Sequence, residues 1–167
     1  MDSRFINAFL ESTRALLGTM LNTTVTFGAP HIYDRLTKHD VSGIVGFSGD
    51  VVGSVVLCLP KASALELVAR LAGTPLAFES ADFTDAVGEL VNMIAGGAKA
   101  RFTGRTVAIS CPSVVVASEH QVQAPSGTVC VCIPCSSPTG EFAINVAIQA
   151  SAPAPGVPGA ARAGARA

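Results

Sequence analysis

The order of apolar and polar positions predicts helices and strands in turn along this chain. Near the N-terminus, residues 3–20 carry an apolar stripe at helical spacing, made of Phe5, Phe9, Leu16 and Met20. We therefore expect an amphipathic helix over this segment.

Residues 42–59 give the clearest strand signal. Two runs rich in Val and Ile flank the turn sequence at 48–50, Ser-Gly-Asp, which predicts a β-hairpin. Before it, residues 22–27 predict a short strand and residues 28–40 a loop. After it, a helix is expected over residues 61–72, since a proline precedes that segment and a glycine follows it.

A second long helix is expected from Asp82, as its N-cap, to about Arg101. Further strands are predicted after it, with Gly140 marking the turn between the last two. These strands cover residues 106–110, 113–118, 127–133 and 141–149.

The last residues differ in composition from the rest of the chain. Residues 151–167 hold almost nothing but Ala, Pro and Gly, with two arginines. Such a segment lacks the apolar side chains for a core, so we predict a disordered tail after a domain over residues 1–150.

The two halves of the predicted domain resemble each other. The residues at matching helix positions are Asn7, Glu11, Arg14 and Gly18 in the first half, and Asp85, Glu89, Asn92 and Gly96 in the second. Residues 49–59 also align with residues 140–150. We therefore predict an α/β (α+β) fold in which two long helices pack on one antiparallel sheet, with internal duplication and pseudo-two-fold symmetry.

Composition narrows the classes of function. The chain has 167 residues, a net charge of -1, only 14% charged residues and five cysteines. A near-neutral chain lacks the basic character of a nucleic-acid-binding protein, and no apolar run has the length of a membrane span. No signal peptide is evident, so we expect a cytoplasmic protein with reduced thiols and no membrane contact.

The predicted helix over residues 82–101 has an unusual polar stripe. A helical wheel places Asp85, Glu89, Asn92, Gly96 and Lys99 opposite the apolar face. Glu89 and Asn92 are three residues apart on this helix, so their Cβ atoms lie roughly 5–6 Å from each other. An exposed glycine inside a helix costs about 1 kcal/mol relative to alanine, and a close approach by a partner would explain it.

A glutamate and an amide on one helix face suit a particular chemistry. An asparagine amide both donates and accepts hydrogen bonds, so Asn92 can hold and orient a water molecule. Phosphoryl transfer needs such positioning more than it needs a strong base. Glu89 can pair with a cation on a partner, and Lys99 can touch the same partner. The plainer interpretation is a solvated helix face, with Asp85 favouring the helix N-terminus.

The remaining reactive side chains give weaker signals. Cys130, Cys132 and Cys135 suggest zinc, but a tetrahedral site needs a fourth ligand and none is obvious nearby. We interpret them as structural thiols. His31 and the other two histidines fall in segments predicted to be loops, so we expect them at the surface.

Three segments together resemble the CheC/CheX/FliY family of bacterial chemotaxis phosphatases, and most of all its CheX members. They are FINAFLEST at 5–13, DVSGIVGFSGDVVGSVVL at 40–57 and DAVGELVNMIAGGAKA at 85–100. The resemblance covers about residues 1–150.

The resemblance implies a substrate and roles for the site residues. The substrate is the phosphoaspartate of a CheY-type receiver domain, which itself supplies the Mg²⁺ and a lysine. Asn92 orients the attacking water, and Glu89 pairs with that lysine. The protein holds no cofactor of its own. Arg14, in place of a first-half asparagine, implies one active site per chain, and CheX-like proteins tend to form homodimers through sheet edges.

Two alternatives remain at this point. One is a non-catalytic module that binds a response regulator or resembles a flagellar-switch component. The other is the same phosphatase acting on a receiver outside chemotaxis. The intact pair of Glu89 and Asn92 favours catalysis, because a pure scaffold does not need the amide.

Overall fold

The computed structural model describes residues 3–33, 39–123 and 127–150. The helices are α1 (Ser3–Ala15), α2 (Lys61–Ala72) and α3 (Ala81–Lys99), and the π-helix η1 (Leu16–Met20) continues α1. The strands are β1 (Thr26–Phe27), β2 (His31–Ile32), β3 (His39–Gly49), β4 (Val51–Leu59), β5 (Val107–Ile109), β6 (Ser113–His120), β7 (Val131–Ser137) and β8 (Gly140–Ala150). The predicted tail, residues 151–167, lies outside the described residues.

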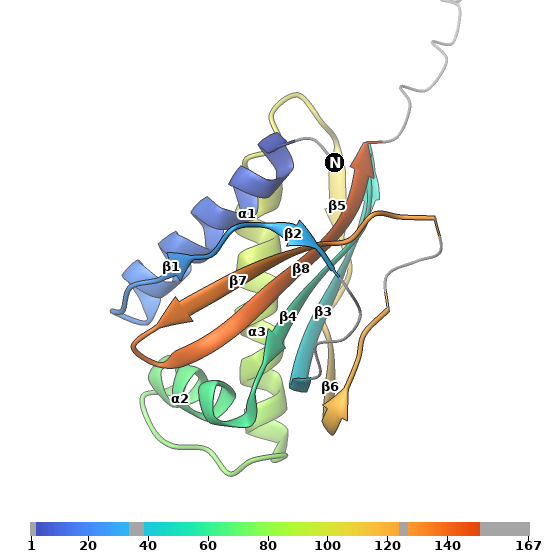
Figure 1. Cartoon of the computed structure of the whole chain (residues 1–167). Helices are drawn as coiled ribbons and strands as arrows, with labels where there is room; N and C mark the ends of the chain where they lie inside the picture. Colours follow the sequence, from blue (N-terminus) through green and yellow to red (C-terminus); the bar gives the residue numbers. More distant parts are fainter. Residues whose placement is uncertain (1–2, 34–38, 124–126, 151–167) are drawn as a thin grey trace, which may run out of the picture.

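The strands form one antiparallel sheet, and α1 and α3 lie side by side on one of its faces (Figure 1). The strand order is β1-β7-β8-β4-β3-β5, with β2 also pairing with β7 and β6 also pairing with β3. The predicted architecture of two long helices on an antiparallel sheet is therefore confirmed, with α2 as an additional short helix between the halves.

The register of the central strands supports the predicted duplication. Val55 of β4 pairs with Val146 of β8, and these two residues hold equivalent places in the alignment of residues 49–59 with 140–150. A two-fold axis between this pair exchanges β4 with β8. Both halves also follow one order, a helix and then four strands.

The two halves exchange their edge strands. β1 and β2 of the first half pair with β7 of the second, whereas β5 and β6 of the second half pair with β3 of the first. Neither half can therefore complete its own part of the sheet. The two duplicated halves together form a single folding unit.

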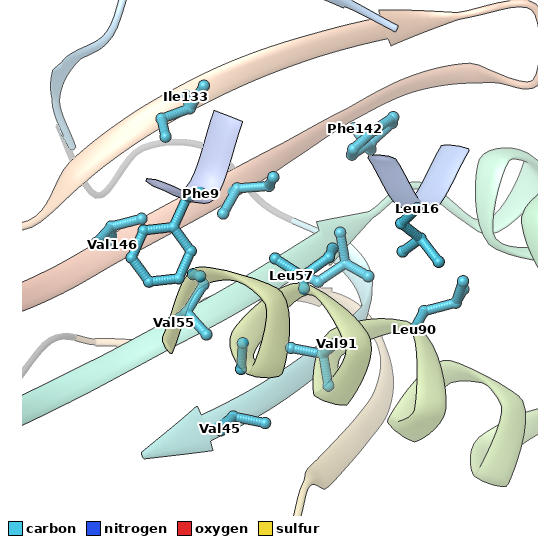
Figure 2. Close-up of a cluster of buried hydrophobic side chains, with 14 of the residues drawn as sticks. Phe9, Leu16, Val45, Val55, Leu57, Leu90, Val91, Ile133, Phe142 and Val146 are labelled. Atoms are coloured by element: carbon cyan, nitrogen blue, oxygen red, sulfur yellow. The ribbon is translucent and has the colours of Figure 1, made fainter. Parts of the chain in front are cut away.

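The core lies between the helix pair and the sheet. Side chains from α1, α3 and the central strands meet there, as Figure 2 shows for Phe9, Leu90 and Val146 among others. The face of α3 opposite its polar stripe is buried, as the helical wheel predicts, through Phe83, Val87, Leu90, Val91, Ile94 and Ala98. Burial of several such side chains, each contributing about 1.5–3 kcal/mol, fixes which face of α3 points outward.

Two glycines allow α3 to pack closely. A Cβ atom at Gly43 of β3 would lie 2.9 Å from Cγ1 of Val91, so only glycine lets α3 approach the sheet at this point. A Cβ atom at Gly97 would overlap the hydroxyl of Ser12 on α1. That hydroxyl is buried and donates a hydrogen bond of 2.8 Å to the Ile94 carbonyl oxygen. The orientation of α3 is thus set from both sides.

Several sequence predictions need correction. The N-cap of α3 is Ser80, not Asp82, because the Ser80 hydroxyl accepts the Phe83 backbone N–H. Met20 was placed on the apolar stripe of the first helix, but it is 54% exposed, since the π-helical turn of η1 changes the periodicity. The segment predicted as a loop, residues 28–40, contains β2 and the start of β3.

Candidate functional site

The polar stripe of α3 faces solvent, as its spacing predicts. Asp85, Glu89 and Lys99 are exposed, and Asn92 and Gly96 are half-buried. These five residues are called the α3 stripe below. Since the opposite face of α3 is anchored in the core, the stripe stands on a rigid element that cannot rotate to hide it.

Glu89 and Asn92 lie on the stripe without internal partners. Among the described residues, neither side chain forms a hydrogen bond or an ion pair. Their position three residues apart on a helix keeps the carboxylate and the amide roughly 5–6 Å apart at Cβ. The structure therefore leaves both groups available to a molecule that approaches this face.

Gly96 follows Asn92 by one turn and leaves the helix surface open. A Cβ atom at Gly96 would meet no atom within 4 Å among the described residues outside its own stretch of helix, so packing against them does not require this glycine. Its neighbour Gly97 has the opposite role, the contact with α1 described above. Gly97 thus permits an internal contact between α3 and α1, whereas Gly96 leaves part of the helix surface open.

A groove of about 610 Å³ begins at Gly96 and runs between the end of α3 and β5. Lys99 and Arg105 line it, together with Thr106 and the apolar side chains of Val107 and Ile109. The sequence pattern does not indicate Arg105, because this residue lies beyond the predicted helix. It comes close to the α3 stripe only because β5 folds back alongside α3.

The equivalent place in the first half is occupied differently. Arg14 stands where the second half has Asn92, and its guanidinium lies 5.3 Å from the centroid of the Phe27 ring. Glu11, the counterpart of Glu89, forms an ion pair of 3.1 Å with Arg101. The first helix therefore presents no free pair of glutamate and amide.

The cysteines do not form one site. All five are free thiols. Cys132 and Cys135 are buried, and the regular register of β7 places them on opposite faces of the sheet. Within residues 3–33, 39–123 and 127–150, no group of three His, Cys, Asp or Glu residues is arranged to hold a metal ion.

One of the three histidines is not at the surface, contrary to the sequence prediction. His39 begins β3 and is 6% exposed, because it pairs with His120 of β6. The His120 ring lies 2.8 Å from the Ser42 hydroxyl through Nε2. Burial lowers the pKa of His39, and the charge of His120 lowers it further, against an opposing effect of Asp40. These groups lie in the sheet, away from the α3 stripe.

No helix in the described part of the chain is long and apolar enough to cross a membrane.

Comparison with known proteins gives consistent matches. The family model of the chemotaxis phosphatase CheX matches residues 41–136. The CheY-P phosphatase CheX of Thermotoga maritima is 27% identical over 128 residues, which cover 74% of this chain and 82% of that protein.

Two solved structures extend the match to the fold. A CheC-like superfamily protein from Shewanella sp. PV-4 has a TM-score of 0.82 and 33% identity, over 89% of this chain and 99% of that one. A chain of the CheX–CheY–BeF₃–Mg²⁺ complex from Borrelia burgdorferi has a TM-score of 0.72 and 26% identity, over 87% of this chain and 97% of that one. With a family model that spans residues 41–136 of 167, this chain belongs to the chemotaxis phosphatase CheX family.

Proposed function

We propose that this protein hydrolyses the phosphoaspartate of a CheY-type receiver domain, and that Asn92 and Glu89 of α3 carry the activity. The observation that supports it best is the exposed pair of amide and carboxylate, without partners among the described residues, in a chain of the CheX family. The similar proteins from T. maritima and B. burgdorferi carry CheY in their names.

Asn92 is proposed to place the attacking water. Its amide oxygen accepts one proton of the water, and the water's lone pair then points at the phosphorus atom of the phosphoaspartate. Hydrolysis breaks the bond between the phosphorus and the aspartyl oxygen, releasing inorganic phosphate and the free carboxylate. A loose phosphoryl-transfer transition state is favoured by such positioning, and the amide needs no basic pKa for it.

Glu89 is proposed to fix the docked receiver. Its exposed carboxylate can form a charge-assisted hydrogen bond with a lysine ammonium group of the receiver. Because Glu89 and Asn92 share one helix face, a receiver bound through Glu89 has its phosphoryl group near Asn92. The Mg²⁺ belongs to the receiver in this proposal, as the B. burgdorferi complex suggests.

The proposal includes one site per chain and a cytoplasmic location. Arg14 stacks on Phe27 in the place equivalent to Asn92, so the first half lacks the amide. The five free thiols suit a reducing compartment.

We also propose that the protein forms a homodimer through a sheet edge. Within the described residues, β6 pairs only with β3, which leaves its other edge open. An open edge of this length is a template for pairing with a second copy.

The decisive experiment follows the decay of a phosphorylated CheY-type receiver with Mg²⁺, alone, with this protein, and with its Asn92→Ala variant. We expect faster decay with the protein and at least about a tenfold loss of turnover in the variant, which corresponds to about 1.4 kcal/mol of barrier. Asn92 is only half-buried and forms no hydrogen bond with any described residue, so the variant should unfold at the same temperature.

The outcomes separate the proposals. Unchanged turnover in a folded Asn92→Ala protein would exclude the water-orienting role. If the wild-type protein binds the phosphorylated receiver but does not accelerate its decay, a non-catalytic binding module replaces the phosphatase. Glu89→Ala should act mainly on docking, and its defect should disappear when the receiver's lysine is also removed.

A further inference from the structure

The charges along the α3 stripe are separated by sign. The first half of α3 carries the carboxylates of Asp82, Asp85 and Glu89, all exposed. The end of α3 carries Lys99, and the groove that starts at Gly96 adds Arg105. At about 1.5 Å rise per residue, Glu89 and Lys99 stand roughly 15 Å apart along the helix, with Asn92 between them.

Among the described residues, no carboxylate forms an ion pair with Lys99 or Arg105. The Asp50 carboxylate lies beside the groove, where its Oδ2 accepts a hydrogen bond of 2.7 Å from the backbone N–H of Thr106. Arg105 donates from Nη1 to the Asp50 carbonyl oxygen at 3.4 Å and lies over the Phe5 ring. Its guanidinium is thus held in place, with no carboxylate partner in the part of the chain that the structure describes.

A second cavity extends the same positive region. It has about 240 Å³ and lies between α1 and residues 101–105, which follow α3, and Arg105 lines both this cavity and the groove. Arg4 and Arg101 line it as well, and its carboxylate, Glu11, is paired with Arg101. A chain with a net charge of only -1 therefore concentrates cations at one end of its candidate site.

We propose that the groove lined by Lys99 and Arg105 receives an acidic part of the phosphorylated receiver and sets its orientation on α3. This inference rests on the proposed function and adds to it a second contact region and a residue outside the helix, Arg105. The phosphoryl group itself meets Asn92, and the receiver's Mg²⁺ requires carboxylates, so the receiver carries further acidic groups around its reacting centre. The positive groove, about 10 Å further along α3, attracts these acidic groups, and the carboxylates at the other end of the stripe repel them, so one orientation is favoured.

The open space at Gly96 supports simultaneous contact of the receiver with Asn92 and with the groove. Gly96, between Asn92 and the groove, has no side chain, and among the described residues beyond its own stretch of helix no atom lies within 4 Å of the place where its Cβ atom would stand. A partner that contacts both the amide and the groove therefore meets no side chain at position 96.

The test is a pair of double variants that remove the same number of positive charges. Lys99→Gln with Arg105→Gln alters the groove. Lys61→Gln with Arg70→Gln is the matched control, since both residues lie on α2 and line neither the groove nor the second cavity. Steady-state dephosphorylation of the receiver is measured at low and at high salt, and the affinity for a beryllofluoride-loaded receiver is measured separately.

We expect the groove variant to raise KM at least about fivefold at low salt, with a smaller effect on kcat, and to flatten the salt dependence of KM. The control should keep the salt dependence of the wild-type protein. Equal KM and equal salt dependence in the groove variant and the wild type would overturn the inference, and so would an equal change in the control.

The binding arm distinguishes failure of this inference from failure of the proposed function. If the wild-type protein accelerates decay but the groove variant binds as tightly as the wild type, only the inference fails. If the wild-type protein neither binds nor dephosphorylates the receiver, the proposed function fails and the inference fails with it.

Discussion

At the scale of single residues, burial decides which reactive groups can be used. Cys58 is fully buried, and burial raises the pKa of its thiol, with a further contribution from the charge of Cys132. Burial likewise raises the pKa of Cys135 to about 12. Cys111 is exposed.

We therefore predict that Cys111 is alkylated at least about 10²-fold faster than Cys58 or Cys135 at pH 8, because only a thiolate reacts and both buried thiols stay protonated. Peptide mass spectrometry after timed treatment with iodoacetamide measures the three rates. Comparable rates in the folded protein would mean that the sheet opens on the time scale of the reaction.

His39 makes stability depend on pH. Its pKa in the folded protein is lowered from 6.5, mainly by burial, so below that value the unfolded chain binds more protons than the folded one. Stability from this group is thus present at pH 7.5 and is lost progressively as the pH falls below 6.5 and through the lowered pKa of the folded protein. We predict a lower free energy of unfolding at about pH 5.5, and a weaker pH dependence in His39→Leu. Urea unfolding at both pH values measures it, and an identical dependence in both proteins would contradict the role of His39.

At the residue scale, the sequence predicted the stripe but not its surroundings. The positions of Glu89 and Asn92 follow from helical periodicity alone, which is local. The cap at Ser80 and the approach of Arg105 depend on where the chain turns before and after α3, and periodicity does not contain that information.

At the scale of elements, the adjacent glycines Gly96 and Gly97 of α3 have different roles, one in access to the helix surface and the other in packing. Gly96 faces open space, whereas a side chain at Gly97 would overlap Ser12. We predict that Gly96→Ala stabilises the protein by up to about 1 kcal/mol through helix propensity, yet lowers phosphatase activity because a methyl group enters the path of the receiver. Gly97→Ala should instead destabilise it by about 1–3 kcal/mol by pushing α1 away.

Thermal unfolding and receiver dephosphorylation, measured on both variants, check this pair of predictions. Full activity in Gly96→Ala would show that the receiver does not approach the helix there. Unchanged stability in Gly97→Ala would show that α1 and α3 can separate without cost.

The elements themselves were predicted to different degrees. The range of α2 was predicted correctly, and α3 within two residues, since both have clear periodicity and end signals. β2 and the first residues of β3 were missed, because they become strands through pairing with β7 and β6, which lie far away in the sequence.

At the scale of the whole molecule, the duplication could be found in the sequence, but the exchange of edge strands could not. The matching helices and the alignment of residues 49–59 with 140–150 depend only on residue types. The placement of β1 and β2 beside β7, and of β5 and β6 beside β3, depends on how the connecting segments run in three dimensions.

The same exchange places β6 at an edge of the sheet, where it determines the proposed assembly. Val115 of β6 is 37% exposed, so a charged side chain fits there at little cost to folding. We predict that the wild-type protein is a dimer in solution and that Val115→Lys converts it to a monomer, since two copies pairing along β6 would bring like charges together.

Light scattering coupled to gel filtration gives the mass of each variant. Ile32→Lys is the matched control, because Ile32 is 72% exposed on β2, which belongs to the opposite edge of the sheet. A dimer that survives Val115→Lys but not Ile32→Lys would place the interface on the β1 and β2 edge. A monomeric wild-type protein would exclude the homodimer and leave the α3 stripe to act in a single chain.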